Sequence, residues 1–314
     1  MAGNTVRASW WAMAMLCSAL AQAQTSISPA RIAELLKARE PRLQATLRDA
    51  ISGLERNPRS VSDIRAAAET LDLLGAPDTA RELYNRLLEV VRTPEDRISI
   101  QRAMGISRAF AGDCKGAEAV ENNAVVTLTR AGEYYGAGEV ANEIGRICLD
   151  VGDWANARKW YSAGHSYGLR EENLSKERFA LWDFRWLNAQ ARIAVRRGDT
   201  AEARKRMQAA VALSGKGLAV DQLIYIPYLK GYVTFYSGAY EEARIELEKA
   251  EAEDPFAQCL LGRAYEHLGF PEKALERYQF VAQSTLHNVN TATAMYWLSG
   301  RANQQREGPP PAKR

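Results

Sequence analysis

Residues 228–255, YLKGYVTFYSGAYEEARIELEKAEAEDP, decide the fold of this chain. Three small residues stand in a fixed register within this stretch: Gly231, then Gly238 seven positions later, then Ala243 five positions after that. A glycine can end a helix at little steric cost by taking the left-handed conformation. Small residues on both sides of such a turn let two antiparallel helices approach closely. The stretch therefore predicts two helices packed together around a turn at Gly238.

The same register recurs six times along the chain. The turn glycine and the alanine five residues after it are Gly75 and Ala80, Gly112 and Ala117, Gly152 and Ala157, Gly198 and Ala203, Gly238 and Ala243, and Gly269 and Ala274. Seven residues before each glycine stands another small residue: Ala68, Gly105, Gly145, Ala191, Gly231 and Gly262. Because a single helix pair cannot bury its apolar face, the six pairs are expected to stack on one another.

This arrangement resembles the tetratricopeptide repeat, most closely at residues 228–255, and the resemblance covers roughly residues 60–286. It implies an all-α fold: a right-handed superhelical solenoid of about six antiparallel helix pairs. Successive turn glycines are 37, 40, 46, 40 and 31 residues apart, whereas the family repeat is usually about 34 residues long. We therefore expect an irregular superhelix, with its longest insertion between Gly152 and Gly198 and a truncated second helix before Pro255.

The first 23 residues have the layout of a secretory signal peptide. Arg7 is their only charge, an apolar run extends from Trp10 to Leu20, and the small residues Ala21 and Ala23 follow on either side of Gln22. This layout predicts cleavage after Ala23. The apolar run is too short to span a bilayer of about 30 Å. An uncleaved anchor and a lipoprotein attached through Cys17 are the alternatives.

Four further segments complete the predicted organisation. N-terminal helices occupy residues 24–59, with Ser28 and Pro29 forming a favourable helix start. Six tetratricopeptide-like units occupy residues 60–289. A helix at residues 290–306 is expected to cap the stack, with Met295 and Leu298 turned inward, and residues 307–314 are expected to be a disordered tail.

Composition argues against several classes of partner. The hydrophobic fraction of 46% and the charged fraction of 25% are ordinary for a folded protein. The formal net charge of +3 is slight, so neither nucleic acid nor an anionic membrane is expected as the main partner. We also expect no transmembrane segment once the signal peptide has been removed.

Removal of the signal peptide leaves three cysteines, Cys114, Cys148 and Cys259. Three is an odd number, so at least one thiol is unpaired within the chain. Cys114 and Cys148 are 34 residues apart, about one repeat, so stacking of the repeats could bring them together in a disulfide. Alternatively, all three are small buried apolar residues.

Two catalytic-looking strings lack the context that their chemistry needs. Residues 164–168, GHSYG, match a nucleophile elbow around Ser166, but that motif requires a strand-to-helix turn. Residues 136–141, GAGEVA, match a dinucleotide fingerprint, which requires a preceding strand. We interpret the first as a helix end and the second as an interhelical turn. The three histidines are scattered and show no metal-ligand spacing, so we expect no catalytic site, no metal and no cofactor.

The resemblance also indicates where a ligand would bind, because in the tetratricopeptide family the first helix of each pair lines a concave groove that usually binds peptides. Positions 13, 10, 6, 3 and 2 before a turn glycine fall on one helical stripe. The candidate groove residues on these stripes are Asn142, Arg146, Arg185, Asn188, Arg192, Arg196, Tyr225, Tyr228, Tyr232 and Tyr236. Arginine binds carboxylates bidentately, and tyrosine and arginine are enriched at binding hot spots.

These residues predict a groove for an extended peptide that carries an acidic group. The alternative is that the tyrosines pack between helices and the arginines are solvated surface charges. We expect a non-catalytic protein–protein interaction scaffold of the bacterial cell envelope, periplasmic or extracellular, whose partner is a protein or peptide. A hydrolase acting on an envelope polymer and a repeat protein that self-assembles through open ends are the alternatives.

Overall fold

The computed structural model of the protein describes residues 27–307. The predicted signal peptide at residues 1–23 and all but the first residue of the predicted tail lie outside this range. The part of the chain that is described contains helices and no strand. None of the helices between residues 27 and 307 is long and apolar enough to cross a membrane.

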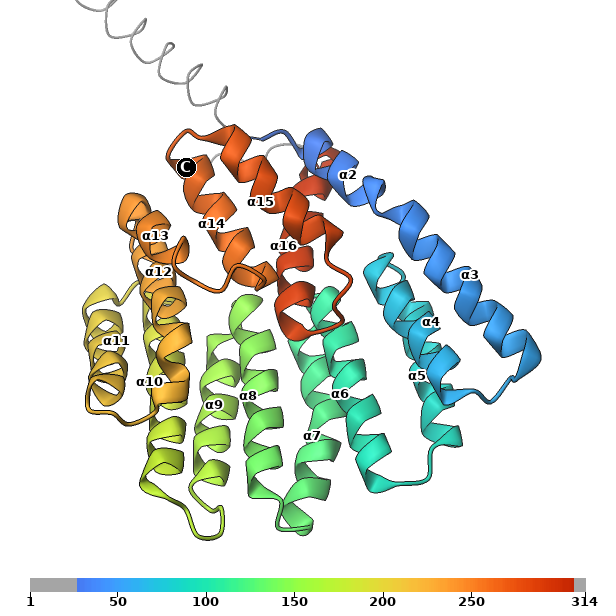
Figure 1. Cartoon of the computed structure of the whole chain (residues 1–314), viewed down its shortest axis with the longest axis horizontal. Coiled ribbons are helices and arrows are strands. Elements are labelled where there is room, and N and C mark those ends of the chain that lie inside the picture. The colour runs from blue at the N-terminus through green and yellow to red at the C-terminus, as the bar shows by residue number, and fades with distance from the viewer. Residues whose placement is uncertain (1–26, 308–314) are drawn as a thin grey trace, which may run out of the picture.

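Six helix pairs form a curved stack, as the repeat register predicts (Figure 1). The pairs are α4 (Val61–Leu73) with α5 (Pro77–Val90), α6 (Pro94–Phe110) with α7 (Cys114–Arg130), α8 (Tyr134–Asp150) with α9 (Trp154–Gly168), α10 (Lys176–Arg196) with α11 (Thr200–Gly215), α12 (Ile226–Tyr236) with α13 (Tyr240–Leu247), and α14 (Pro255–His267) with α15 (Pro271–Gln283). The fold is therefore an all-α solenoid of consecutively packed helix pairs.

The six predicted turn glycines all have a left-handed backbone, with φ between 67° and 89°. At the second turn, the amide of Gly112 donates to the carbonyl of Ala109 at 3.0 Å, and the amide of Asp113 donates to that of Arg108 at 2.9 Å. The carboxylate of Asp113 then accepts from the amide of Gly116 at 2.8 Å and caps the next helix. One short motif thus ends α6 and begins α7.

The small residues on both sides of each turn lie at the contact between the paired helices. All six alanines that follow the turn glycines are fully buried. A Cβ atom added at Gly231 would lie 2.5 Å from Cγ of Leu247, so a larger residue would push the two helices apart. Tyr or Leu occupies the position nine residues after the turn glycine in four pairs. In the second pair Glu121 occupies it, fully buried opposite Gly105.

The irregular spacing appears where the sequence predicts it. Helix α10 is 21 residues long and lies in the longest interval between turn glycines. Helix α13 has only 8 residues, which is the truncated helix expected before Pro255. A short 3-10 helix, η1 (Val220–Tyr225), precedes α12.

The flanking helices close the stack. Helix α2 (Pro29–Ala38) is capped by Ser28, and α3 (Glu40–Arg56) packs on α4. Helix α16 (Val289–Glu307) contacts α6 and α8 in addition to α14, α15 and α2. Helix α16 thus packs on the last pair, where the cap was expected, and also reaches α6 and α8 on the concave side of the stack (Figure 1). Met295 and Leu298 are buried, as predicted.

Specific polar contacts hold this closure together. The amide of Ile27 donates to Oε1 of Glu266 at 3.0 Å, and its carbonyl accepts from Nη2 of Arg301 at 2.7 Å. Arg301 also pairs with Glu266 at 2.6 Å. In the loop before α16, the ring of His287 lies 2.8 Å from Oδ2 of the buried Asp72 on α4. Helix α16 is thus bonded to the last repeat, and the loop before it is bonded to the first.

A disulfide joins Cys114 to Cys148, with the two Cα atoms 4.8 Å apart. It connects the first residue of α7 to the third residue from the end of the neighbouring α8, because the stacked repeats place these positions side by side. The pairing considered from the 34-residue spacing is therefore present. Cys259 is buried as a free thiol, and burial raises its pKa to about 12.

Candidate functional site

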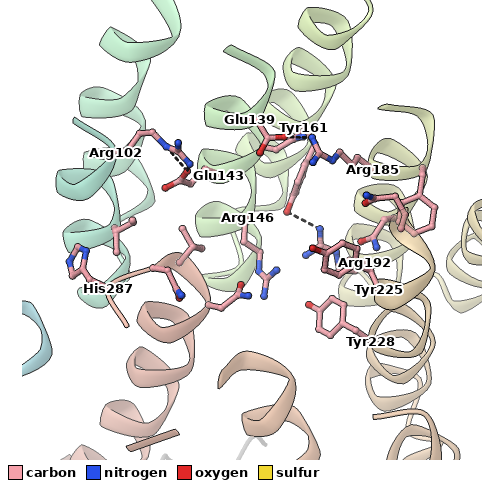
Figure 2. A pocket seen from close by; sticks show the side chains of 18 residues that line it. Arg102, Glu139, Glu143, Arg146, Tyr161, Arg185, Arg192, Tyr225, Tyr228 and His287 are labelled. Carbon is pink, nitrogen blue, oxygen red and sulfur yellow. Dashed lines mark hydrogen bonds and ion pairs between the residues drawn. The ribbon is translucent and has the colours of Figure 1, made fainter. Parts of the chain in front are cut away.

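A cavity of about 650 Å³ opens on the concave side of the stack. Side chains of α6, α8, α10, η1 and α12 line it, and residues 287–290 form its opposite wall (Figure 2). The candidate groove residues that line it are Asn142, Arg146, Arg185, Asn188, Arg192, Tyr225 and Tyr228. The first helix of each central pair therefore faces the cavity, as the stripe predicts.

Three candidate groove residues do not reach the cavity. Tyr232 is fully buried in the core, where its hydroxyl accepts from Nη1 of Arg196 at 3.2 Å. The guanidinium of Arg196 also lies 4.7 Å from the ring centroid of Tyr236, whose hydroxyl accepts from Arg263 at 3.0 Å. Tyr232 and Tyr236 therefore pack between helices, as the alternative held, because α14 covers this end of α12. Arg196 is half-buried against these two tyrosines rather than a solvated surface charge.

Two ion pairs neutralise one side of the cavity. Nε and Nη2 of Arg102 donate to Oε2 of Glu143 at 2.9 and 2.6 Å. Arg185 pairs with Glu139 across the neighbouring helices. Arg102 and Glu143 were not among the candidates, although Glu143 directly follows Asn142 on α8. These four residues leave no net charge for a ligand to compensate.

Arg146 is held in place but keeps one donor free. Its Nε donates to Oδ2 of Asp150 at 2.7 Å, and its guanidinium carbon lies 4.4 Å from the ring centroid of Phe256. Its Nη2 has no hydrogen-bond partner within residues 27–307. The ion pair fixes the orientation of the guanidinium and leaves Nη2 buried without an acceptor.

Arg192 is the least compensated charge of the site. It is only 6% exposed, and Nη2 donates to the hydroxyl of Tyr161 at 2.9 Å. Its Nε and Nη1 find no partner in the described part of the chain, and no carboxylate there forms a salt bridge with it. An uncompensated buried charge costs several kcal/mol. The arrangement therefore favours an anion beside Arg192.

Tyr228 adds a neutral donor at the same place. Its hydroxyl has no hydrogen-bond partner among residues 27–307. Burial raises the pKa of Tyr228 to about 12, although the charges of Arg146 and Arg192 act in the opposite direction, so the phenol is protonated at neutral pH. The side chains of Arg146, Arg192 and Tyr228 converge in Figure 2. We call these three residues the anion cluster.

The anion cluster can bind but offers no obvious reaction. Two guanidinium groups and a phenol donate hydrogen bonds to an anionic oxygen. The cluster supplies no nucleophile and no general base. Helical spacing alone does not predict the rest of the cavity wall. Tyr161 comes from the second helix of its pair, and residues 287–290 come from outside the repeats. Only the position of Tyr161, nine residues after Gly152, signals that it faces α8.

The two catalytic-looking strings lie within helices. Ser166 lies near the end of α9, as predicted, and its side chain is exposed. The adjacent His165 bonds to Asp183 at 2.8 Å, but it points about 100° away around the helix, and no hydrogen bond joins it to Ser166. The interhelical turn predicted at residues 136–141 was wrong: these residues form the start of α8, and the turn lies at Gly132.

No group of three or more histidine, cysteine, aspartate or glutamate side chains within residues 27–307 could hold a metal ion.

Comparison with known proteins gives little further information. No protein-family model matches the chain, and no curated protein matches it in sequence. Among solved structures, the chain is similar to BtubC (BKLC) from P. vanneervenii, with a TM-score of 0.42 and 15% sequence identity. That match covers 89% of this chain and 95% of BtubC. A likeness of this degree carries no argument about function.

Proposed function

We propose that this protein is a non-catalytic binding protein of the bacterial cell envelope, and that the anion cluster holds an acidic group of a protein or peptide partner. The observation that carries the proposal is the state of Arg192: a buried guanidinium with two free donors and no carboxylate partner in the described chain. A ligand carboxylate would complete these hydrogen bonds and compensate the charge.

The size of the site supports a segment of a partner rather than a long extended peptide. A cavity of about 650 Å³ is in the range of small-molecule and side-chain sites. Helix α16 occupies another part of the concave side, against α6 and α8, so a peptide has no continuous path along all six repeats. The proposed site is therefore a pocket for a few residues of the partner, rather than the groove for an extended peptide that the sequence predicts.

Three observations support the remaining parts of the proposal. The six left-handed turn glycines and the buried alanines support membership of the tetratricopeptide family. The disulfide between Cys114 and Cys148 fits an oxidising compartment and so supports export. The contacts of α2 with α15 and α16 cover the end of the stack, which favours a binding role over self-assembly through open ends.

Affinity capture from native envelope extract tests the proposal. Wild type is compared with Arg192→Gln, which removes the charge, and with Arg204→Gln on α11, away from the cavity. A charged hydrogen bond contributes about 1.5–3 kcal/mol, so we expect recovery of the specific partner to fall at least tenfold for Arg192→Gln alone. Equal recovery by all three proteins would overturn the proposal.

A further inference from the structure

The 3-10 helix η1 exposes an unusual run of apolar side chains beside the cavity. Val220 is 51% exposed, Leu223 46% and Ile224 58%. Contiguous exposed apolar side chains at one place on a protein surface commonly mark an interaction site. We call Val220, Leu223 and Ile224 the η1 shelf.

The η1 shelf belongs to the same short helix as two residues of the cavity wall. Gln222 and Tyr225 of the same short helix line the cavity. In a 3-10 helix, residues three apart lie on the same side, so Gln222 and Tyr225 face inward together while the shelf residues occupy the other sides at the rim. Val220 and Leu223 share a second side of η1, and Ile224 shares the third side with the exposed Asp221.

The backbone holds η1 in this position through an uncommon geometry. Ala219, directly before η1, has φ of 52°, and Gly217 has φ of 73°. A left-handed conformation at alanine costs about 1–2 kcal/mol. Such strain persists only where the surrounding structure fixes it, and it is concentrated at functional sites.

We propose that the η1 shelf binds a large apolar side chain of the same peptide segment whose carboxylate reaches the anion cluster. This inference rests on the proposed function and names the class of partner. The positive charge of Arg192 selects an acidic residue, and the shelf selects an aliphatic or aromatic residue near it. Because the shelf belongs to the same six-residue helix as Gln222 and Tyr225 of the cavity wall, we expect the apolar residue within about three positions of the acidic one, a span of about 10 Å in an extended chain.

A positional-scanning library of N-acetylated, C-amidated hexapeptides tests the inference by capture on the immobilised protein. We expect enrichment of Asp or Glu at one position and of Leu, Ile, Phe or Trp within three positions of it. The best peptide is then resynthesised with Ala at its apolar position. Its affinity for wild type should fall about tenfold or more, and the same change should have little effect on the double variant Leu223→Ser/Ile224→Ser.

Different results overturn different statements. Enrichment of an acidic residue without an apolar neighbour would overturn the role of the shelf and leave the proposed function standing. No enrichment of acidic residues would overturn both. A change of oligomeric state in Leu223→Ser/Ile224→Ser, measured by sedimentation, would show that a second copy of the chain covers the shelf. Ile245→Ser, an exposed residue on α13, is the matched control for folding and for loss of surface apolar area.

Discussion

Glu121 departs most from the repeat pattern at the scale of single residues. The equivalent residues of the other pairs are Tyr84, Tyr161, Met207, Leu247 and Tyr278. Glu121 is fully buried, and neither of its carboxylate oxygens has a hydrogen-bond partner in residues 27–307. Burial, and then the charge of Glu143, raise the pKa of Glu121 well above its ordinary value, while Arg102 acts in the opposite direction. The core of the second pair thus contains an unsatisfied polar group.

We expect Glu121→Leu to stabilise the protein by about 1–3 kcal/mol, because leucine leaves no polar atom unsatisfied. Leu247 occupies the same position opposite Gly231. The folded-state pKa of Glu121 is raised, so its contribution to stability falls as the pH rises from about 4.5 through that pKa. The gain in the free energy of unfolding from Glu121→Leu should therefore be larger near pH 8 than near pH 5.

Urea unfolding at the two pH values measures this gain in stability. The exposed Glu82 on α5 provides the control Glu82→Leu, which should change the free energy of unfolding by less than about 0.5 kcal/mol. A loss of stability in Glu121→Leu near pH 8, or the same gain at both pH values, would contradict the argument.

The sequence predicts which way a side chain points more reliably than it predicts which residues surround that side chain. Helical spacing correctly turns Arg146, Arg192 and Tyr228 toward the concave side. The same spacing fails for Tyr232 and Tyr236, because α14 lies over them. What lies opposite a helical stripe depends on the neighbouring repeat, and the stripe itself contains no information about it.

At the scale of elements, the turns are the most predictable feature and α16 the least. A turn needs only local chemistry: glycine at the helix end and, in several repeats, an aspartate cap. Helix α16 contacts α2 and α6, which are at least 179 residues away in sequence. Its apolar pattern, with Met295 and Leu298 inward, is compatible with a terminal cap and with a place on the concave side, so the pattern could not distinguish the two.

The link between α7 and α8 should be sensitive to reduction. Replacing Cys114 and Cys148 by serine opens a loop of 34 residues and should lower the free energy of unfolding by about 2–4 kcal/mol. For the chain cut after Ala23, alkylation in denaturant should label one thiol without reductant and three with it, as measured by mass. Three labelled thiols without reductant would rule out the disulfide.

At the scale of the whole molecule, the contact of Arg301 with Glu266 and Ile27 joins the two ends of the stack. Burial acts to raise the pKa of Glu266, but hydrogen bonds and the charge of Arg301 outweigh it and lower the pKa. This pair therefore stabilises the folded state above about pH 4.5, and its contribution is lost as the pH falls through the folded-state pKa.

We expect Arg301→Gln to destabilise the protein by about 2 kcal/mol at neutral pH, because the pair is partly buried, and by less in acid. Thermal unfolding as a function of pH measures the difference. Arg206→Gln, which breaks the half-exposed pair with Glu202 on α11, should cost less than about 1 kcal/mol. An equal loss in the two variants would mean that the closure contributes no more than a surface ion pair.

The closure also determines how the chain folds. In an open repeat array each unit contacts only its neighbours, so folding can begin anywhere and the end units can unfold alone. Here hydrogen bonds connect residues 239 and 274 positions apart, and they can form only after the intervening repeats are in place. Such a high contact order slows folding, and it makes the end repeats part of a single cooperative unit.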